Sequence, residues 1–183
     1  VGLAGAIVIG PRLGRFGKDG EVNAIPGHNM AMAALGVFIL WFGWFGFNGG
    51  SGLVADGSVA KILLNTNLAA AMGGISAFLT SIIVQGRPVV EKMFNGILGG
   101  LVGITAGCAA VDPMGAVLIG VTSGQVVFWS EELLLKLRID DPVGAIPVHG
   151  FCGAWGTVAL ALFAPSGALA AGSRLAQIVV QIV

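Results

Sequence analysis

The sequence predicts an all-α membrane protein, a bundle of helices that crosses the bilayer several times. Of the 183 residues, 56% are hydrophobic and only 10% are charged, whereas a soluble domain carries about 25% charged residues. The chain also contains 31 glycines, which membrane helices tolerate and use for close packing. In addition, the charged residues divide the chain into long uncharged blocks that match the length of a membrane span.

Five of these blocks are long enough to cross a bilayer as a helix. They are Val22–Ala55 with its core at Asn29–Asn48, Ile62–Gly86, Met93–Val111, Pro113–Ser130 with an extension through Leu135, and Pro142–Ser173 with a break near Pro165.

The two ends of the chain add one shorter apolar segment each. Val1–Pro11 lacks the basic leader of a signal peptide and resembles the back end of a helix. Leu175–Val183 is also shorter than the roughly 20 residues of a full span. We therefore expect seven helical elements, and we expect residues 1–183 to be a single transmembrane domain, a fragment cut within a helix at both ends.

Basic residues gather in alternate connections between the blocks, which predicts the topology. The positive-inside tendency places such connections in the cytoplasm, so the Val22–Ala55 helix is expected to run outward. The basic residues of the first, third and fifth connections are Arg12, Arg15, Lys18, Arg87, Lys92, Lys136 and Arg138.

Two connections carry the residues of a helix start. Asp112 precedes Pro113, and Asp141 precedes Pro142. An Asp N-cap accepts a hydrogen bond from a free backbone amide, and Pro at the first helical position presets the backbone. Both pairs therefore predict helix starts. Asp140, the acidic neighbour of Asp141, is also expected to act as a cap.

Glycines recur four residues apart within the blocks, a spacing that lets helix backbones approach closely in lipid. One interpretation is a compact bundle with a narrow axis, and the other is ordinary helix packing. The pairs are Gly46 and Gly50, Gly96 and Gly100, Gly99 and Gly103, Gly103 and Gly107, and Gly120 and Gly124.

The composition excludes several functional classes. The formal net charge is zero, so no basic surface is available for nucleic acid. Cys108 and Cys152 lack the spacing of ligands or of a disulfide, and we expect them to be small buried residues. No metal-site spacing and no phosphate-binding glycine loop is found. The sequence thus predicts no metal, no cofactor and no enzyme activity.

The two histidines stand in different surroundings. His28 lies in the connection before the first full block, where a surface or capping role is expected. His149 lies inside an uncharged block. Ionisable residues within a membrane are costly and usually face an interior path, although a histidine near a helix end can instead bond a backbone carbonyl. Both readings of His149 stay open on the residues alone.

An aromatic run precedes the end of the first block, in residues Trp41–Ser51. Such aromatics can form a membrane-interface belt. However, Phe47 and Ser51 are four residues apart and share a helix face. An aromatic ring beside a hydroxyl suits the capture of a small cation by cation–π contact and hydrogen bonding.

Two motifs resemble the Amt/Mep/Rh ammonium transporter family. The run Gly43–Ser51 is similar to the sixth-helix signature of that family, and Asp140–Pro142 followed by Val148–Gly153 is similar to the start of its tenth helix. The resemblance covers essentially the whole chain. It implies the second half of an eleven-helix fold built from two inverted halves, which assembles as a homotrimer with one pore per subunit.

The resemblance also implies roles for four residues. His149 would be one of two paired pore histidines that relay a proton, and Phe47 one of two stacked rings that close the outer mouth. Ser51 would supply the hydroxyl of the outer recruitment site, and Trp44 a pore-lining aromatic. The partner histidine, the second gate ring and the recruitment tryptophan would lie outside this chain.

The implied function is transport of ammonium across the cell membrane. Ammonium would bind at the outer mouth and give up its proton, because carrying the intact ion through an apolar path is costly. A PII-type signal protein at the cytoplasmic face is a possible partner in this family. The alternatives are an ammonium sensor fused to a signalling domain, an intramembrane enzyme such as a quinone-linked oxidoreductase, and a structural membrane subunit.

Overall fold

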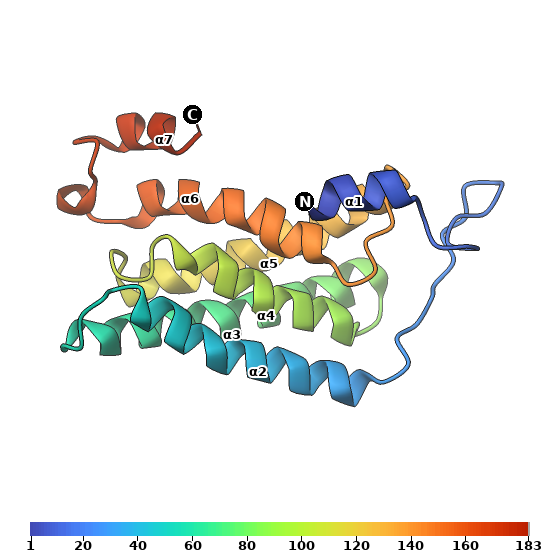
Figure 1. Cartoon of the computed structure of the whole chain (residues 1–183), viewed down its shortest axis with the longest axis horizontal. Helices are drawn as coiled ribbons and strands as arrows, with labels where there is room; N and C mark the ends of the chain where they lie inside the picture. Colours follow the sequence, from blue (N-terminus) through green and yellow to red (C-terminus); the bar gives the residue numbers. More distant parts are fainter. Residues whose placement is uncertain (183) are drawn as a thin grey trace.

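The computed structural model describes residues 1–182, and within them the chain forms a bundle of long helices without a β-strand (Figure 1). This confirms the predicted all-α class. Val183, the last residue of the predicted C-terminal segment, lies outside the described residues. The elements are α1 (Gly2–Ile9), α2 (Met30–Gly50), α3 (Ser58–Gln85), α4 (Val90–Thr105), α5 (Pro113–Lys136), the π-helix η1 (Ile146–Phe151) that continues into α6 (Cys152–Phe163), the 3-10 turn η2 (Ser166–Ala168) and α7 (Arg174–Ile182).

Four of the helical segments are long and apolar enough to cross a membrane. They are α2, α3, α5 and the continuous segment of η1 and α6. The chain is therefore a multi-pass membrane protein, as predicted. The predicted break near Pro165 is also confirmed, because α6 ends at Phe163.

The helix α4 is shorter than the Met93–Val111 block predicted. It ends at Thr105, and turns follow as far as Val111. The reason is that Asn65 of α3 donates its side-chain amide to two carbonyls of these turns, those of Cys108 at 2.9 Å and Val111 at 3.0 Å. A buried carbonyl that finds a side-chain donor does not need the next helical turn.

The basic connections lie at one end of the bundle, on the right in Figure 1. There Arg12 pairs with Asp140, and Lys92 of α4 pairs with Glu131 of α5 at 2.7 Å. This confirms that the first, third and fifth connections share a side. That this side faces the cytoplasm stays a prediction.

Asp140 is an ion-pair partner and not the helix cap that the sequence suggested. Its side chain is only 2% exposed. The Arg12 guanidinium donates to both carboxylate oxygens, from Nε at 2.7 Å and from Nη2 at 2.8 Å, and the Arg12 backbone amide donates at 3.0 Å. Arg15 Nε stands 3.5 Å from the same carboxylate. Burial of the carboxylate is possible because the guanidinium matches it in charge and geometry.

The Asp112–Pro113 start is confirmed, whereas the Asp141–Pro142 start is wrong by several residues. Asp112 accepts a hydrogen bond from the Gly115 amide at 2.7 Å, with Pro113 at the first turn of α5. Asp141 does cap a helix, but it reaches forward to the Ile146 amide at 2.7 Å. The helix therefore begins at Ile146, after a loop that includes Pro142 and the left-handed Gly144.

Close packing of α3 against α4 and α5 forms the centre of the bundle. A Cβ atom added at Gly96 of α4 or at Gly120 of α5 would lie 2.5 Å from a carbonyl oxygen of α3, that of Gly73 or Ala69 respectively. No real Cβ atom approaches a carbonyl so closely. The glycines of these pairs thus let two helices sit directly on the backbone of α3.

The pair Gly46 and Gly50 does not share this role. A Cβ atom added at either position would meet no atom within 4 Å among the described residues. The spacing of four residues therefore identified the packing glycines of α4 and α5. It also predicted a packing role for the pair on α2, which contacts no other helix in the described residues.

We expect Gly96→Ala to destabilise the protein and Gly46→Ala to leave it nearly unchanged. The added methyl group at Gly96 meets the Gly73 carbonyl at 2.5 Å and the Ala77 Cβ at 2.6 Å, whereas at Gly46 it meets open space. Overpacking of this kind costs about 1–3 kcal/mol. Thermal unfolding of each variant in detergent measures the difference. Equal midpoints for the two variants would contradict the packing described.

We expect the contribution of Asp140 to stability to depend on pH. The hydrogen bond from Arg12 lowers the pKa of the Asp140 carboxyl below its ordinary value. A lowered pKa in the folded state gives stability that is fully present above the ordinary value and is lost as the pH falls through the folded value. Asp140→Asn should therefore reduce the unfolding midpoint by a constant amount above about pH 5, and by less below about pH 4. Melting curves at stepped pH test this, and a difference independent of pH would refute it.

Candidate functional site

The first group of candidate residues lies at the C-terminal end of α2. The helix begins where the Asn29 side chain accepts a hydrogen bond from the Met32 amide at 2.9 Å, and it ends at Gly50. Trp44 and Phe47 therefore lie in its last two turns and Ser51 directly follows it, at the end opposite the basic connections (Figure 1).

The Trp44 side chain is fixed by a bond to a neighbouring helix. Its indole Nε1 donates a hydrogen bond to Thr105 Oγ1 of α4 at 2.9 Å, and that hydroxyl donates to the Leu101 carbonyl at 2.8 Å. The Trp44 ring meets the Phe47 ring edge to face, with centroids 5.5 Å apart and planes at 65°. The aromatic pair is thus held from the α4 side.

Phe47 and Ser51 are both open to the surface of the chain. The Phe47 side chain is 57% exposed. Ser51 Oγ donates its proton to the Phe47 carbonyl at 2.6 Å, which leaves its oxygen lone pairs available as acceptors. A cation with N–H groups could therefore donate to Ser51 while it rests near an aromatic ring.

Asn48 does not belong to this open group. It is only 2% exposed, and its side-chain amide donates to Thr66 Oγ1 of α3 at 3.0 Å. The Asn48 side-chain amide thus joins α2 to α3.

His149 lies in the π-helix η1, on the wall of a cavity of about 660 Å³. Its neighbours Pro147 and Val148 are buried, whereas His149 and Gly150 are exposed. A π-helix is uncommon and often occurs at functional sites, because the extra residue in its turn rotates the side chains that follow. The lining residues are Val1, Gly2 and Leu3 of α1 and its N-terminus, together with Ala145, Ile146, His149, Gly150, Phe151 and Ala154.

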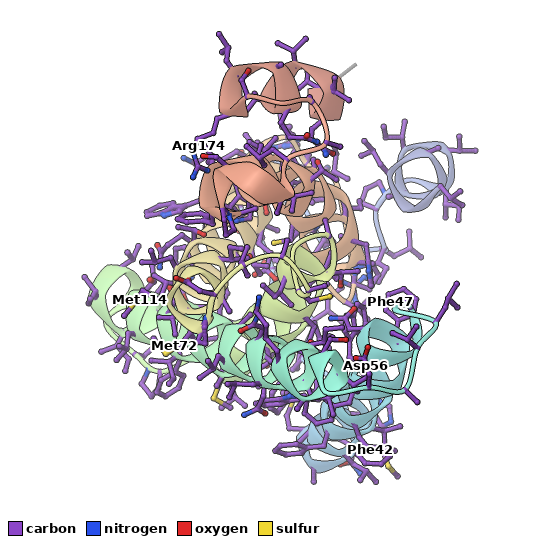
Figure 2. All side chains as sticks on the ribbon, turned by 90° about the vertical axis from the view of Figure 1, so that its left-hand side faces the viewer. Phe42, Phe47, Asp56, Met72, Met114 and Arg174 are labelled. Carbon is purple, nitrogen blue, oxygen red and sulfur yellow. The ribbon has the colours of Figure 1, made fainter. Side chains whose placement is uncertain are left out.

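The structure keeps His149 apart from the outer aromatic group, but it places both on one side of the bundle. In Figure 2, which looks from the end opposite the basic connections, Phe47 lies on the same side as α1, and α1 forms one wall of the His149 cavity. The other histidine, His28, is exposed in the connection before α2, as the sequence predicted.

A polar cluster of Lys92, Asn95, Glu131 and Glu132, which the sequence did not reveal, lies against the loop leading to η1. Lys92 bonds both Glu131 at 2.7 Å and Glu132 at 2.9 Å, and the Asn95 amide donates to Glu131 at 2.6 Å. A Cβ atom at Gly144 would come within 2.9 Å of the Glu131 carboxylate, so the loop rests directly on the cluster. Only the excess of charge in these connections could have suggested it.

No metal site accompanies these residues. Within residues 1–182, no group of three or more His, Cys, Asp or Glu side chains is placed to hold a metal ion. Cys108 and Cys152 are both buried, as expected for small core residues.

Comparison with known proteins identifies the family of this chain. The model of the Ammonium Transporter Family matches residues 1–183. Ammonium transporter Amt2 of Archaeoglobus fulgidus is 50% identical over 165 residues, which is 90% of this chain and 35% of that protein. Ammonium transporter 1 member 1 of Oryza sativa is 39% identical over 89% of this chain and 35% of its own length.

Solved structures agree with the sequence comparison. A structure titled "Sensor Amt Protein" matches 98% of this chain with a TM-score of 0.95 and 44% identity, over 45% of its own length. The crystal structure of Mep2 from Candida albicans matches 98% of this chain with a TM-score of 0.86 and 30% identity, over 42% of its length. The chain thus spans about a third of the length of the curated relatives reported above and somewhat under half of these structures.

We expect Thr105→Val to loosen the Trp44 ring. The substitution keeps the shape of the side chain but removes the acceptor of the indole N–H, and a part-buried donor without a partner costs about 1–3 kcal/mol. The measurements are thermal stability and the emission of Trp44 in a variant that lacks the other tryptophans. The control is Thr122→Val, at a hydroxyl of α5 that likewise donates to carbonyls of its own helix. A Thr105→Val protein identical to the wild type in both measurements would mean that the bond does not hold the ring.

Proposed function

This chain belongs to the ammonium transporter family, and from that premise we propose that it forms part of the conduction path of an ammonium transporter. The share of the relatives that it covers, 35% for the Archaeoglobus protein, supports the interpretation that it is a single transmembrane domain cut from a longer chain. The remaining wall of the path, including a second histidine, would come from the part of the protein outside it.

The outer end of α2 is proposed to recruit ammonium. Ser51 would accept an N–H of the ion, and Phe47, as the outer gate, would offer the face of its ring. Trp44 would line the path behind the gate. The support is geometric, because Ser51 and Phe47 are exposed while the Trp44–Thr105 bond fixes the ring beside them.

Below the gate, the ion is proposed to release its proton and cross as ammonia. Moving an intact ammonium ion through an apolar path costs several kcal/mol or more. Ammonia is uncharged, so it avoids most of this cost, whereas potassium has no proton to release. His149 would position or relay the proton, because a neutral imidazole offers both a donor and an acceptor.

The observation that carries this proposal is the orientation of His149. Val148 and Cys152 on either side of it are almost completely buried in the bundle. His149 instead lines a cavity. Because an imidazole that faced lipid would be costly, this position favours a role on an interior path. The helix α1, which forms one wall of the cavity, lies on the same side of the molecule as Phe47 (Figure 2), as residues along a common path would.

The setting of the complete protein is also proposed. It would lie in the cell membrane as a homotrimer, and a PII-type signal protein could regulate it at the end that carries the basic connections. The apolar side chains exposed on α2, such as Phe38 and Phe42, are compatible with cover by lipid or by a neighbouring subunit. The site residues themselves call for no metal or cofactor in this mechanism.

A sensor is the second candidate, because the structure titled "Sensor Amt Protein" aligns with a TM-score of 0.95. The Archaeoglobus protein, which is named as a transporter, is 50% identical to this chain, against 44% for the sensor structure. Transport is therefore the function that the comparisons favour, and a signalling domain attached to this one would favour the sensor.

We expect His149→Ala in the full-length protein to abolish the ammonium-driven current. The alanine removes one imidazole of the proposed pair, so the relay of the proton is interrupted. Currents recorded from proteoliposomes on a solid-supported membrane measure this. The control is His28→Ala, which alters an exposed loop residue and should keep the wild-type current. An unchanged current in His149→Ala would remove His149 from the mechanism.

A further inference from the structure

The cavity beside His149 has two walls that belong to distant parts of the chain. One is the start of α1, and the other is η1 with the first turn of α6. The walls approach each other at Gly2, where an added Cβ atom would lie 3.8 Å from Ile146 Cγ1. The position of α1 therefore determines how wide the cavity is next to the imidazole.

Within residues 1–182, the packing of α1 against the rest of the chain is slight, because none of its residues is buried. The helix ends at Ile9, and the φ of 79° at Gly10 turns the chain away from it. Among residues 1–182, the strong polar contact near this end is the one that Arg12 makes with Asp140, through the three hydrogen bonds described above.

Asp140 lies on the chain segment that positions the other wall. Its neighbour Asp141 accepts hydrogen bonds from the amides of Gly144 at 3.1 Å and Ile146 at 2.7 Å, and Ile146 is the first residue of η1. Two successive carboxylates thus have different tasks. The first binds the segment after α1, and the second fixes the start of the helix that carries His149.

We propose that the Arg12–Asp140 pair is a latch that sets the spacing between α1 and η1, and that Arg12 is thereby a positioning residue for His149. The consequence for transport rests on the proposed function, whereas the spacing itself does not. A planar guanidinium that grips both carboxylate oxygens fixes direction as well as distance, which an ammonium group cannot do. Lysine at position 12 should therefore restore the charge but only part of the alignment.

Cross-linking measures the spacing without reference to transport. In the full-length protein with Cys108→Ala and Cys152→Ala, the pair Gly2→Cys and Ile146→Cys should form a disulfide rapidly under mild oxidation, because side chains at these positions meet. Adding Arg12→Ala or Asp140→Asn should slow its formation about tenfold, the effect expected from losing one charge-assisted pair. Arg12→Lys should fall between these variants and the parent.

The matched control is Lys18→Ala, which removes one positive charge from an exposed residue of the same connection. It should leave the cross-linking rate unchanged. Gel filtration of each variant identifies any that fail to fold. The comparison then uses the latch variants that do fold among Arg12→Ala, Arg12→Lys and Asp140→Asn. An equal rate in a folded latch variant and in the parent would overturn the proposal, as would an equal slowing by Lys18→Ala.

The second readout is the preference for ammonium over the larger methylammonium ion. With the native residues at positions 2 and 146, Arg12→Ala should shift the ratio of the two currents severalfold, and a merely less stable protein would lower both alike. Slower cross-linking with an unchanged ratio would overturn the role of Arg12 in positioning His149. Absence of both ammonium current and ammonium uptake in the wild type would instead refute the proposed function, and the cross-linking rates would still decide the latch.

Discussion

The close contact of three helix backbones is the constraint on which the rest of this structure depends. Ala69 and Gly73 of α3 present their carbonyls to glycines of both α4 and α5. Gly156 of α6 then approaches the Gly103 carbonyl of α4 in the same way, at 2.5 Å from an added Cβ. Lipid offers no hydrophobic drive to join helices, so close packing of small residues must supply the attachment. The resulting rigid core carries α2 on one side and η1 on the other.

Buried polar side chains hold the connections at the ends of the bundle in place. Asn65, Lys92 and Asp140 are each buried and each bonded to a different segment of the chain. They hold connections that apolar packing alone would leave loose, because a buried polar group without a partner is costly. Ser51 and His149 are exposed by contrast. The buried polar side chains thus join segments of the chain, whereas these two exposed side chains are free for the roles proposed above.

The sequence predicted the helices well and their ends unevenly. Hydrophobic blocks and the Asp112–Pro113 pair were sufficient for α5, because a span needs a fixed length of apolar residues and a cap acts locally. The predicted helix start at Pro142 was wrong, since Asp141 caps a helix that begins only at Ile146, five residues ahead. The motifs proposed the candidate site residues, whose roles stay predictions, but they did not reveal the side-chain contacts between distant segments. Asp140 lies 128 residues from Arg12, and no local pattern reports a contact over that separation.

The central claim is that His149 faces the conduction path, within reach of small solutes, while its neighbour Val148 is packed in the core. Reaction of introduced thiols with a small water-soluble methanethiosulfonate tests it most directly, with Cys108→Ala and Cys152→Ala as background. The account predicts that His149→Cys reacts, that saturating ammonium slows the reaction, and that Val148→Cys, at a side chain only 2% exposed, stays unmodified. An unreactive His149→Cys, or equal reaction at both positions, would contradict it.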